Sequence, residues 1–120
     1  MEDKTFLVYE DEIGQAEVRD DMVARIAALA ALGVDGVDSL ENGITLDKIS
    51  SVSWKKLAAG VDVIENGNAI EVYIAMIVAM GTNIPEACNS VQKKVKSEIE
   101  GMLGLKVNHV NIRVSSVKIG

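Results

Sequence analysis

The sequence has very few aromatic residues. Only 3% of its 120 residues are Phe, Trp or Tyr, and Trp54 is the single tryptophan. Sites for bases, sugars and flavins usually stack the ligand on aromatic rings, so this composition disfavours such sites. Hydrophobic residues still make up 48% of the chain, which is typical of a folded domain and not of a disordered one. We therefore expect a core built from Val, Ile, Leu, Ala and Met.

The chain is also poor in residues that bind metals or carry out catalysis. His109 is the only histidine and Cys88 the only cysteine, so neither a two-histidine zinc site nor an internal disulfide can form within one chain. His109 falls on the polar side of an alternating segment, where we expect it to be exposed. Cys88 falls on the apolar stripe of an expected helix, where burial raises the pKa of a thiol. We therefore expect no enzyme activity, no cofactor and no metal.

Positive charge is in short supply as well. The formal net charge is −6, and an acidic domain repels the phosphates of nucleic acids unless its cations cluster. The longest apolar runs, Met22–Leu32 and Val72–Met80, are too short to cross a bilayer. The first residues do not show a basic region followed by an apolar run. We expect a cytoplasmic protein that does not bind nucleic acid and does not insert into the membrane.

The length of the chain fits one domain, which we assign to residues 14–120. Residues 1–13 are acidic around a short apolar patch, Phe6–Tyr9. Two interpretations of this segment stay open. It is either a loosely ordered tail or a peptide that adds to the sheet edge of a partner.

The spacing of apolar residues predicts two long amphipathic helices. In residues 20–32 and 83–103, apolar side chains recur at the helical period. Asp20 or Asp21 can cap the first helix, and Asn83 can cap the second. A glutamate follows Asn83 by three residues, as in a capping box.

Alternating polarity predicts the strands. Val61–Ile64 and Ala69–Ala79 flank an Asn-Gly pair, which is a strong hairpin signal. Further strands are expected at Gln15–Val18, Val34–Leu40 and Val107–Val117, with an irregular segment at Glu41–Ala59 that holds a short helix at Ser53–Ala59. The order is β-α-β-(irregular)-β-β-α-β. This pattern predicts an α+β fold in which both helices pack on one face of a mostly antiparallel or mixed sheet.

Two Gly-x-x-Gly pieces and a lysine cluster could indicate a binding module. The glycine pieces, Gly33–Gly36 and Gly101–Gly104, lack the Lys and Ser or Thr of a phosphate loop, and we interpret both as helix ends. Lys93, Lys94 and Lys96 lie near Glu98 and Glu100, which is typical of a mixed solvated surface. A small-molecule or nucleic-acid binding regulatory module therefore stays the alternative function.

Six residues form the candidate interaction surface. They are Phe6, Tyr9, Trp54, Asn66, Lys93 and Lys94. The alternative for Trp54 is to seal the irregular segment onto the core. For the lysines it is a solvated helix surface.

Four segments carry a family resemblance when they are taken together. They are Ala16–Val37, Gly60–Tyr73, Ile84–Val95 and Gly101–Val114. The last, GMLGLKVNHVNIRV, is similar to a Met-Thr-Gly-Leu-x-Val-x-x-Val-Asn-Val ending. In this order and spacing, the segments resemble the alkaline shock protein 23 family, the envelope stress response family of Gram-positive bacteria. The chain departs from the family at Arg19-Asp20-Asp21, where the family often has Ser-Pro-Glu, and it matches poorly in Glu41–Lys56.

The resemblance implies a non-enzymatic cytoplasmic protein linked to cell-envelope stress. It implies action through protein partners, one of which can be a membrane-anchored protein that holds the chain at the membrane, and it is compatible with homo-oligomers. It carries over no catalytic, cofactor or metal residue. Whether the protein regulates lipid synthesis or supports the envelope, and which partner it binds, stay open at this point.

Overall fold

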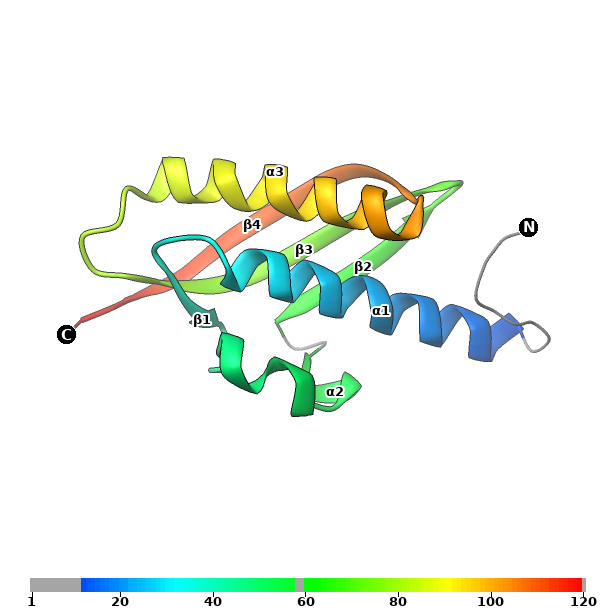
Figure 1. The fold of residues 1–120 in the computed structure, drawn as a ribbon, viewed down its shortest axis with the longest axis horizontal. Helices are drawn as coiled ribbons and strands as arrows, with labels where there is room; N and C mark the ends of the chain where they lie inside the picture. Colours follow the sequence, from blue (N-terminus) through cyan, green and yellow to red (C-terminus); the bar gives the residue numbers. More distant parts are fainter. Residues whose placement is uncertain (1–11, 58–59, 120) are drawn as a thin grey trace.

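A computed structural model describes residues 12–57 and 60–119 of the chain. Figure 1 shows the elements along these residues. They are α1 (Glu12–Leu32), β1 (Val37–Leu40), the 3-10 helix η1 (Leu46–Ser51), α2 (Trp54–Leu57), β2 (Val61–Asn66), β3 (Ala69–Ala79), α3 (Ile84–Leu103) and β4 (Lys106–Lys118). The α+β class is as predicted.

β3 is the centre of a mixed four-stranded sheet. β2 pairs antiparallel with residues 69–74 of β3, and β1 pairs antiparallel with residues 76–78. β4 runs parallel to β3 from Ala69 to Ala79. Because a strand has only two edges, β1 and β2 lie end to end along one edge of β3, and β4 occupies the other.

The alternation of β3 determines which of its sides is buried. Ile70, Val72, Ile74, Met76 and Val78 are at most 2% exposed. The residues between them are half-buried or exposed. The β2–β3 turn has Gly67 at φ +70°, a backbone conformation that glycine adopts without strain. The predicted hairpin is confirmed, and its second strand is the central strand of the sheet.

α3 has the predicted start and end. The Oδ1 atom of Asn83 accepts a hydrogen bond from the backbone N–H of Glu86 at 3.1 Å, and Pro85 lies in the first turn. Gly104 ends the helix in the left-handed conformation, with φ +68°. Gly101 lies inside the helix, so only the second glycine of that Gly-x-x-Gly piece is a helix end.

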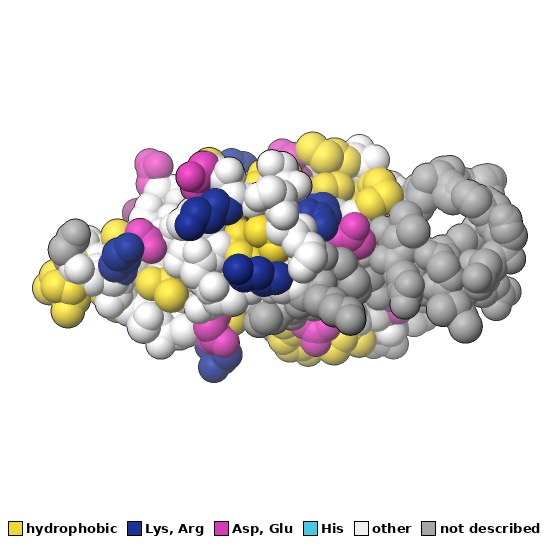
Figure 2. Space-filling model, turned by 90° about the horizontal axis from the view of Figure 1, so that it is seen from below, with side chains coloured by type: hydrophobic (Ala, Val, Ile, Leu, Met, Phe, Trp, Pro, Cys, Tyr) yellow, Lys and Arg dark blue, Asp and Glu magenta, His cyan; other side chains and the backbone are white. Residues whose placement is uncertain are grey.

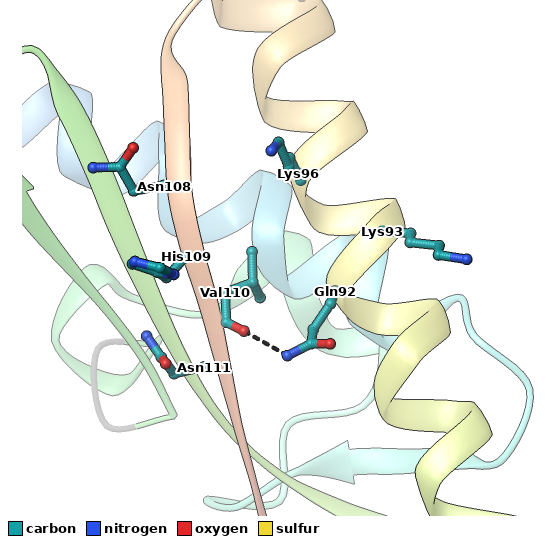
Figure 3. A pocket seen from close by; sticks show the side chains of 7 residues that line it. All are labelled: Gln92, Lys93, Lys96, Asn108, His109, Val110 and Asn111. Carbon is teal, nitrogen blue, oxygen red and sulfur yellow. Dashed lines mark hydrogen bonds between the residues drawn. The ribbon is translucent and has the colours of Figure 1, made fainter.

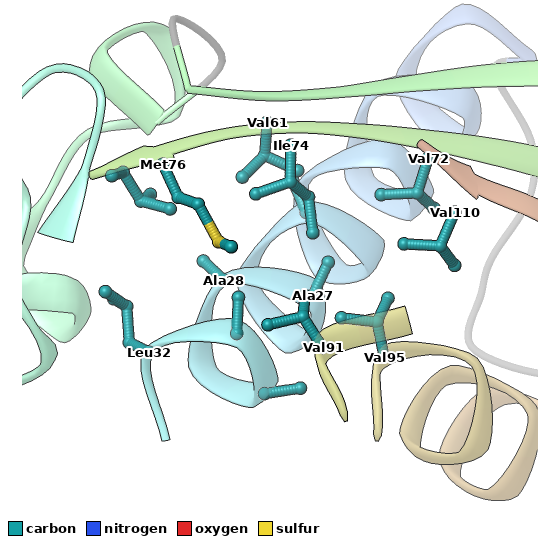
Figure 4. Close-up of a cluster of buried hydrophobic side chains, with 14 of the residues drawn as sticks. Ala27, Ala28, Leu32, Val61, Val72, Ile74, Met76, Val91, Val95 and Val110 are labelled. Carbon is teal, nitrogen blue, oxygen red and sulfur yellow. The ribbon is translucent and has the colours of Figure 1, made fainter. Parts of the chain in front are cut away.

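α1 and α3 pack side by side on one face of the sheet, and the core lies between the helices and the strands (Figure 4). In α1 the buried residues are mostly alanines, and they surround more of the helix than one stripe. They are Val23, Ala24, Ala27, Ala28, Ala30, Ala31 and Leu32. Small side chains let α1 approach its neighbours closely. Residues 23–32 of α1 therefore form a largely buried small-residue segment, and the expectation of two amphipathic helices holds only for α3.

The predicted strand at Gln15–Val18 is wrong, because α1 extends back to Glu12 and includes these residues. Gln15, Ala16 and Glu17 are residue types with high helix propensity, and each residue added to an existing helix gains one hydrogen bond at little cost. Asp20 and Asp21, which we expected to cap the helix, lie inside it. Both edges of β3 are already taken, so the sheet offers no central position to a fifth strand.

The irregular segment expected at Glu41–Ala59 contains η1 and α2. Ile44, Ile49 and Leu57 from this segment are buried in the core. The guanidinium of Arg25 in α1 donates to the backbone carbonyl of Val52 at 2.8 Å and also to that of Ile49. The segment is thus tied to α1. The strand expected at Val34–Leu40 begins only at Val37, because the chain turns at Gly33–Gly36.

Replacing Ala28 by leucine tests the close approach of α1. Ala28 is fully buried, so the added volume has no space, and we expect Ala28→Leu to lower the free energy of unfolding by about 1–3 kcal/mol. Leu29, which is 46% exposed, provides the control. We expect Leu29→Ala to change the free energy of unfolding by less than about 0.5 kcal/mol. Urea unfolding followed by circular dichroism measures both. Equal losses from the two variants would contradict this packing.

Candidate functional site

One face of the sheet is left uncovered by the described helices. Residues that pair directly in a sheet ladder share a face, so the register with β3 identifies this surface. We call it the open face. It comprises Asp62 and Ile64 of β2, Glu71, Tyr73, Ala75 and Ile77 of β3, and His109, Asn111 and Arg113 of β4.

The open face exposes two large apolar side chains. Ile64 is 44% exposed and Tyr73 41%. The hydroxyl of Tyr73 donates to Oε1 of Glu71 at 3.1 Å. That hydrogen bond, together with the negative charge of Glu71, raises the pKa of the Tyr73 phenol. The surface therefore combines apolar area with charged groups beside it.

Two ion pairs span β3 from one edge to the other. Nη2 of Arg113 lies 2.6 Å from Oε1 of Glu41, which follows β1. The pair passes beside Ala75, the direct neighbour of Arg113 in β3, whose side chain is small. Nζ of Lys118 lies 3.9 Å from Oδ2 of Asp38. Exposed pairs of this kind add little stability. Their main effect is that Arg113 and Lys118 carry their own counter-ions.

A hollow of about 290 Å³ lies between α3 and β4. Figure 3 shows that its polar side chains do not converge: Lys93 points away from the strand, whereas His109 and Asn111 project from the other side of β4. The Nε2 atom of Gln92 donates to the carbonyl of Val110 at 2.9 Å. The hollow therefore does not gather positive charge for an anion, and Gln92 occupies the backbone edge of β4 beside it.

A larger hollow, of about 690 Å³, lies where the end of α1 meets the first turns of α3. A Cβ atom built on Gly33 would lie 2.8 Å from Nζ of Lys94, so this ammonium rests against the end of α1. The last turn of α1 has no basic residue of its own, and the carbonyls at a helix C-terminus carry partial negative charge. Lys94 thus supplies the missing positive charge, while Asp35 and Glu86 in the same hollow disfavour an anionic ligand.

The end of the molecule that holds the C-terminus is apolar. Met80, Val117 and Ile119 are 66%, 43% and 77% exposed, and the N–H of Met80 donates to the carbonyl of Lys118. Figure 2 shows hydrophobic side chains gathered at this end. On the rest of the face drawn there, Lys and Arg are interspersed with Asp and Glu.

Four of the six predicted surface residues belong to the described part of the structure, where they lie on three different elements. Phe6 and Tyr9 lie outside the described residues, Trp54 begins α2, Asn66 ends β2, and Lys93 and Lys94 are exposed on α3. Figure 1 places α2 and α3 on opposite sides of α1. That these residues form one binding surface stays a prediction.

The groups that could carry chemistry are placed as follows. His109 is exposed, as predicted. Cys88 packs partly buried against the core, and burial raises the pKa of its thiol, which makes it a poor nucleophile at neutral pH. Over the described ranges, the structure shows no cluster of three His, Cys, Asp or Glu side chains that could hold a metal ion.

Comparison with known proteins identifies one family and two similar proteins. The family model of the alkaline shock protein 23 family, described as having a cell envelope-related function, matches residues 9–119. The chain is similar to the uncharacterized protein YloU of Bacillus subtilis (strain 168), with 31% identity over 88% of this chain and 90% of YloU. It is also similar to the uncharacterized protein Spy1614 of Streptococcus pyogenes serotype M6, with 29% identity over 88% of this chain and 89% of that protein. No solved structure matches the chain.

None of the helices described in the structure has a stretch that is both long and apolar enough to cross a bilayer.

The pKa of Tyr73 tests the geometry of the open face. With Tyr9 replaced by phenylalanine, Tyr73 is the only tyrosine, and ultraviolet absorbance follows its ionisation. We expect a pKa above the usual value of about 10, and we expect Glu71→Gln to lower it by removing the adjacent charge. Asp62→Asn is the graded control and should lower it less, because Asp62 contributes least to the shift. An unchanged titration in Glu71→Gln would contradict the hydrogen bond.

The position of Lys94 also predicts a measurable effect. Lys94→Gln should lower the free energy of unfolding by roughly 0.3–1 kcal/mol at low salt, and the loss should shrink at high salt because it is electrostatic. Lys93→Gln is the matched control, since Lys93 points away from β4 in Figure 3 and does not line the hollow at the end of α1. Urea titrations at low and high salt compare the variants. A loss that did not depend on salt would show that Lys94 acts through packing and not through charge.

Proposed function

The chain belongs to the alkaline shock protein 23 family, and from this premise we propose that it is a non-enzymatic cytoplasmic protein of the envelope stress response. It acts by binding other proteins through its open face. A partner anchored in the membrane holds it at the envelope. The family's cell envelope-related function supports this proposal at the level of the process, and the open face supports it at the level of the surface.

The observation that carries the proposal is the exposure of Ile64 and Tyr73 on the same face of the sheet. A half-exposed tyrosine with an isoleucine beside it, surrounded by polar groups, has the make-up of the residues that dominate protein interfaces. The rim is polar: Glu71 is bonded to Tyr73, and Arg113 to Glu41. Such a surface suits a folded protein partner better than a small ligand, and neither the hollow beside β4 nor the one at the end of α1 combines an apolar lining with convergent polar groups.

The net charge of −6 supports a protein anchor over direct binding to lipid. The cytoplasmic leaflet of a membrane is negatively charged and attracts clusters of Lys and Arg. On β4 the exposed cations Arg113 and Lys118 are paired with Glu41 and Asp38, and the lysines of α3 share their helix with Glu86, Glu98 and Glu100. The same argument disfavours the alternative function, a nucleic-acid binding module, because that function also needs an excess of cations along one stripe.

Site-specific photo-crosslinking tests the proposal. A photo-reactive amino acid at Tyr73, on the open face, is compared with one at Leu46, which is 49% exposed on η1 and does not belong to that face. The labelled chain is mixed with a detergent-solubilised envelope fraction from the producing cells. We expect a crosslink from position 73 to a membrane protein, and none from position 46.

Competition decides whether the open face makes the contact. An excess of unlabelled wild-type chain should abolish the crosslink. The unlabelled double variant Ile64→Ser/Tyr73→Ser should need an at least about tenfold higher concentration to do so, which corresponds to about 1.4 kcal/mol of lost binding free energy. Leu46→Ser is the matched competitor and should act like the wild type. Equal crosslinks from both positions, or crosslinks to lipid or nucleic acid alone, would contradict the proposal.

A further inference from the structure

β4 is an edge strand along the described part of the sheet. It has 13 residues, it pairs with β3 on one side, and no described strand pairs with its other side. Unpaired edges expose backbone N–H and C=O groups that can accept another strand. What the outer edge of β4 offers therefore depends on which of these groups are already satisfied.

α3 satisfies the outward groups in the first half of β4. The N–H of Val107 donates to Oε2 of Glu100 at 3.0 Å, and the carbonyl of Val110 accepts from Nε2 of Gln92 at 2.9 Å. Figure 3 shows Gln92 reaching from the helix to the strand. A strand approaching this half would have to displace both side chains, so it is closed.

The register identifies the outward groups in the second half. On β3, the N–H groups of Ala75 and Ala79 point to the opposite edge, where they donate to Gly60 and Gly36. By alternation, the backbone N–H and C=O groups of Ile74, Met76 and Val78 point to β4. In a parallel ladder, a residue that points to the neighbouring strand bonds to the residues before and after its direct partner. The direct partners of Ile74, Met76 and Val78 are Ile112, Val114 and Val117. These three residues of β4 therefore direct their own N–H and C=O groups outward, away from β3.

A bulge makes this half of the edge apolar on one side. Val114 pairs with Met76 and Ser116 with Ile77, so Ser115 is an extra residue in β4. The bulge shifts the alternation, and Val117 comes to lie on the helix-covered side beside Val78, as Val114 does beside Met76. Continuing the alternation, Ile119 lies on the same side.

We propose that residues 112–119 pair antiparallel with the same residues of a second copy of the chain. A two-fold axis beside Ser115 places Val114 opposite Val117 of the second copy, and Ile112 opposite Ile119 of the second copy. All four positions direct their backbone groups outward, so each facing pair can exchange two hydrogen bonds. The contact is isologous, since each copy offers the same surface, and the two sheets join into one.

The side chains of this register are complementary. The contact covers Val117 and Ile119, which are 43% and 77% exposed, with the branched side chains of Val114 and Ile112 of the other copy, and apolar pairs of this kind stabilise sheets. Arg113 faces Lys118 of the second copy on the other side. Each of these cations brings its own carboxylate, Glu41 or Asp38, so the facing charges are compensated.

This inference rests on the proposed function only in that both have the chain bind proteins, and the partner named here is a second copy of the chain. The contact uses the outer edge of β4 and not the open face. Its test is the mass of the purified full chain in solution. Analytical ultracentrifugation at submillimolar concentration should give twice the 12.8 kDa of one chain. Val117→Pro should give one chain's mass, because proline removes the outward N–H of Val117 and leaves the inward groups of its neighbours in place. Val117→Thr keeps the N–H and should remain dimeric.

Amide hydrogen exchange measured by NMR provides a second readout on the wild type. The amides of Val114 and Val117 should gain protection as the concentration rises, whereas that of Val107, bonded to Glu100, should be protected at all concentrations. Circular dichroism of Val117→Pro shows whether the monomer is folded. If that variant fails to fold, the exchange pattern alone decides.

Three results would overturn the inference. They are a wild type that stays monomeric, a folded Val117→Pro that stays dimeric, and a dimer that is lost in Ile64→Ser/Tyr73→Ser but kept in Val117→Pro. A monomeric wild type that still crosslinks from position 73 would remove the β4 contact and leave the proposed function intact. A dimeric wild type that gives no crosslink from position 73 would contradict the proposed function and leave the β4 contact intact.

Discussion

The pairing of β3 on both edges is the constraint on which the rest of the structure depends. One edge is shared by β1 and β2, and the other is filled by β4 over its whole length. Because β3 buries alternate residues from Ile70 to Val78, its pleat decides which side of every neighbouring strand receives the helices. The open face exists because α1 and α3 both return to the same side, and the outer edge of β4 exists because the chain supplies no further strand there among the described residues.

Charge is arranged so that it does not gather at one site. Arg113 and Lys118 are drawn across the sheet to Glu41 and Asp38, and Lys94 is drawn to the end of α1. Exposed apolar side chains lie at two places among these charges: Ile64 on the open face, and Val117 and Ile119 at the end of β4. Desolvating such groups costs little when a protein partner covers them, which agrees with a protein that works through binding partners and not through a reaction.

Much of the fold was predictable from local pattern. The α3 boundaries follow from Asn83 and Gly104, and the hairpin follows from an Asn-Gly pair between two alternating runs. The error at Gln15–Val18 has a clear origin, since polar residues with high helix propensity can continue a helix just as well as they can alternate in a strand. The candidate site was less predictable. Tyr73 and Ile64 were visible as members of an alternating pattern, but alternation does not reveal which of two partly apolar sides the helices will cover.

The sequence by itself determined that one chain holds neither a two-histidine metal site nor an internal disulfide. It also determined the α+β class, the limits of α3 and the β2–β3 hairpin, because each of these depends on residue types or on neighbours a few positions apart. Only the tertiary structure decided the joining of β1 and β2 along one edge, the pairing of Glu41 with Arg113 across the sheet, and the outward direction of Val114 and Val117. These features depend on the register between segments far apart in the chain. Register follows from the packing of the whole core, and a single bulge at Ser115 is enough to change it.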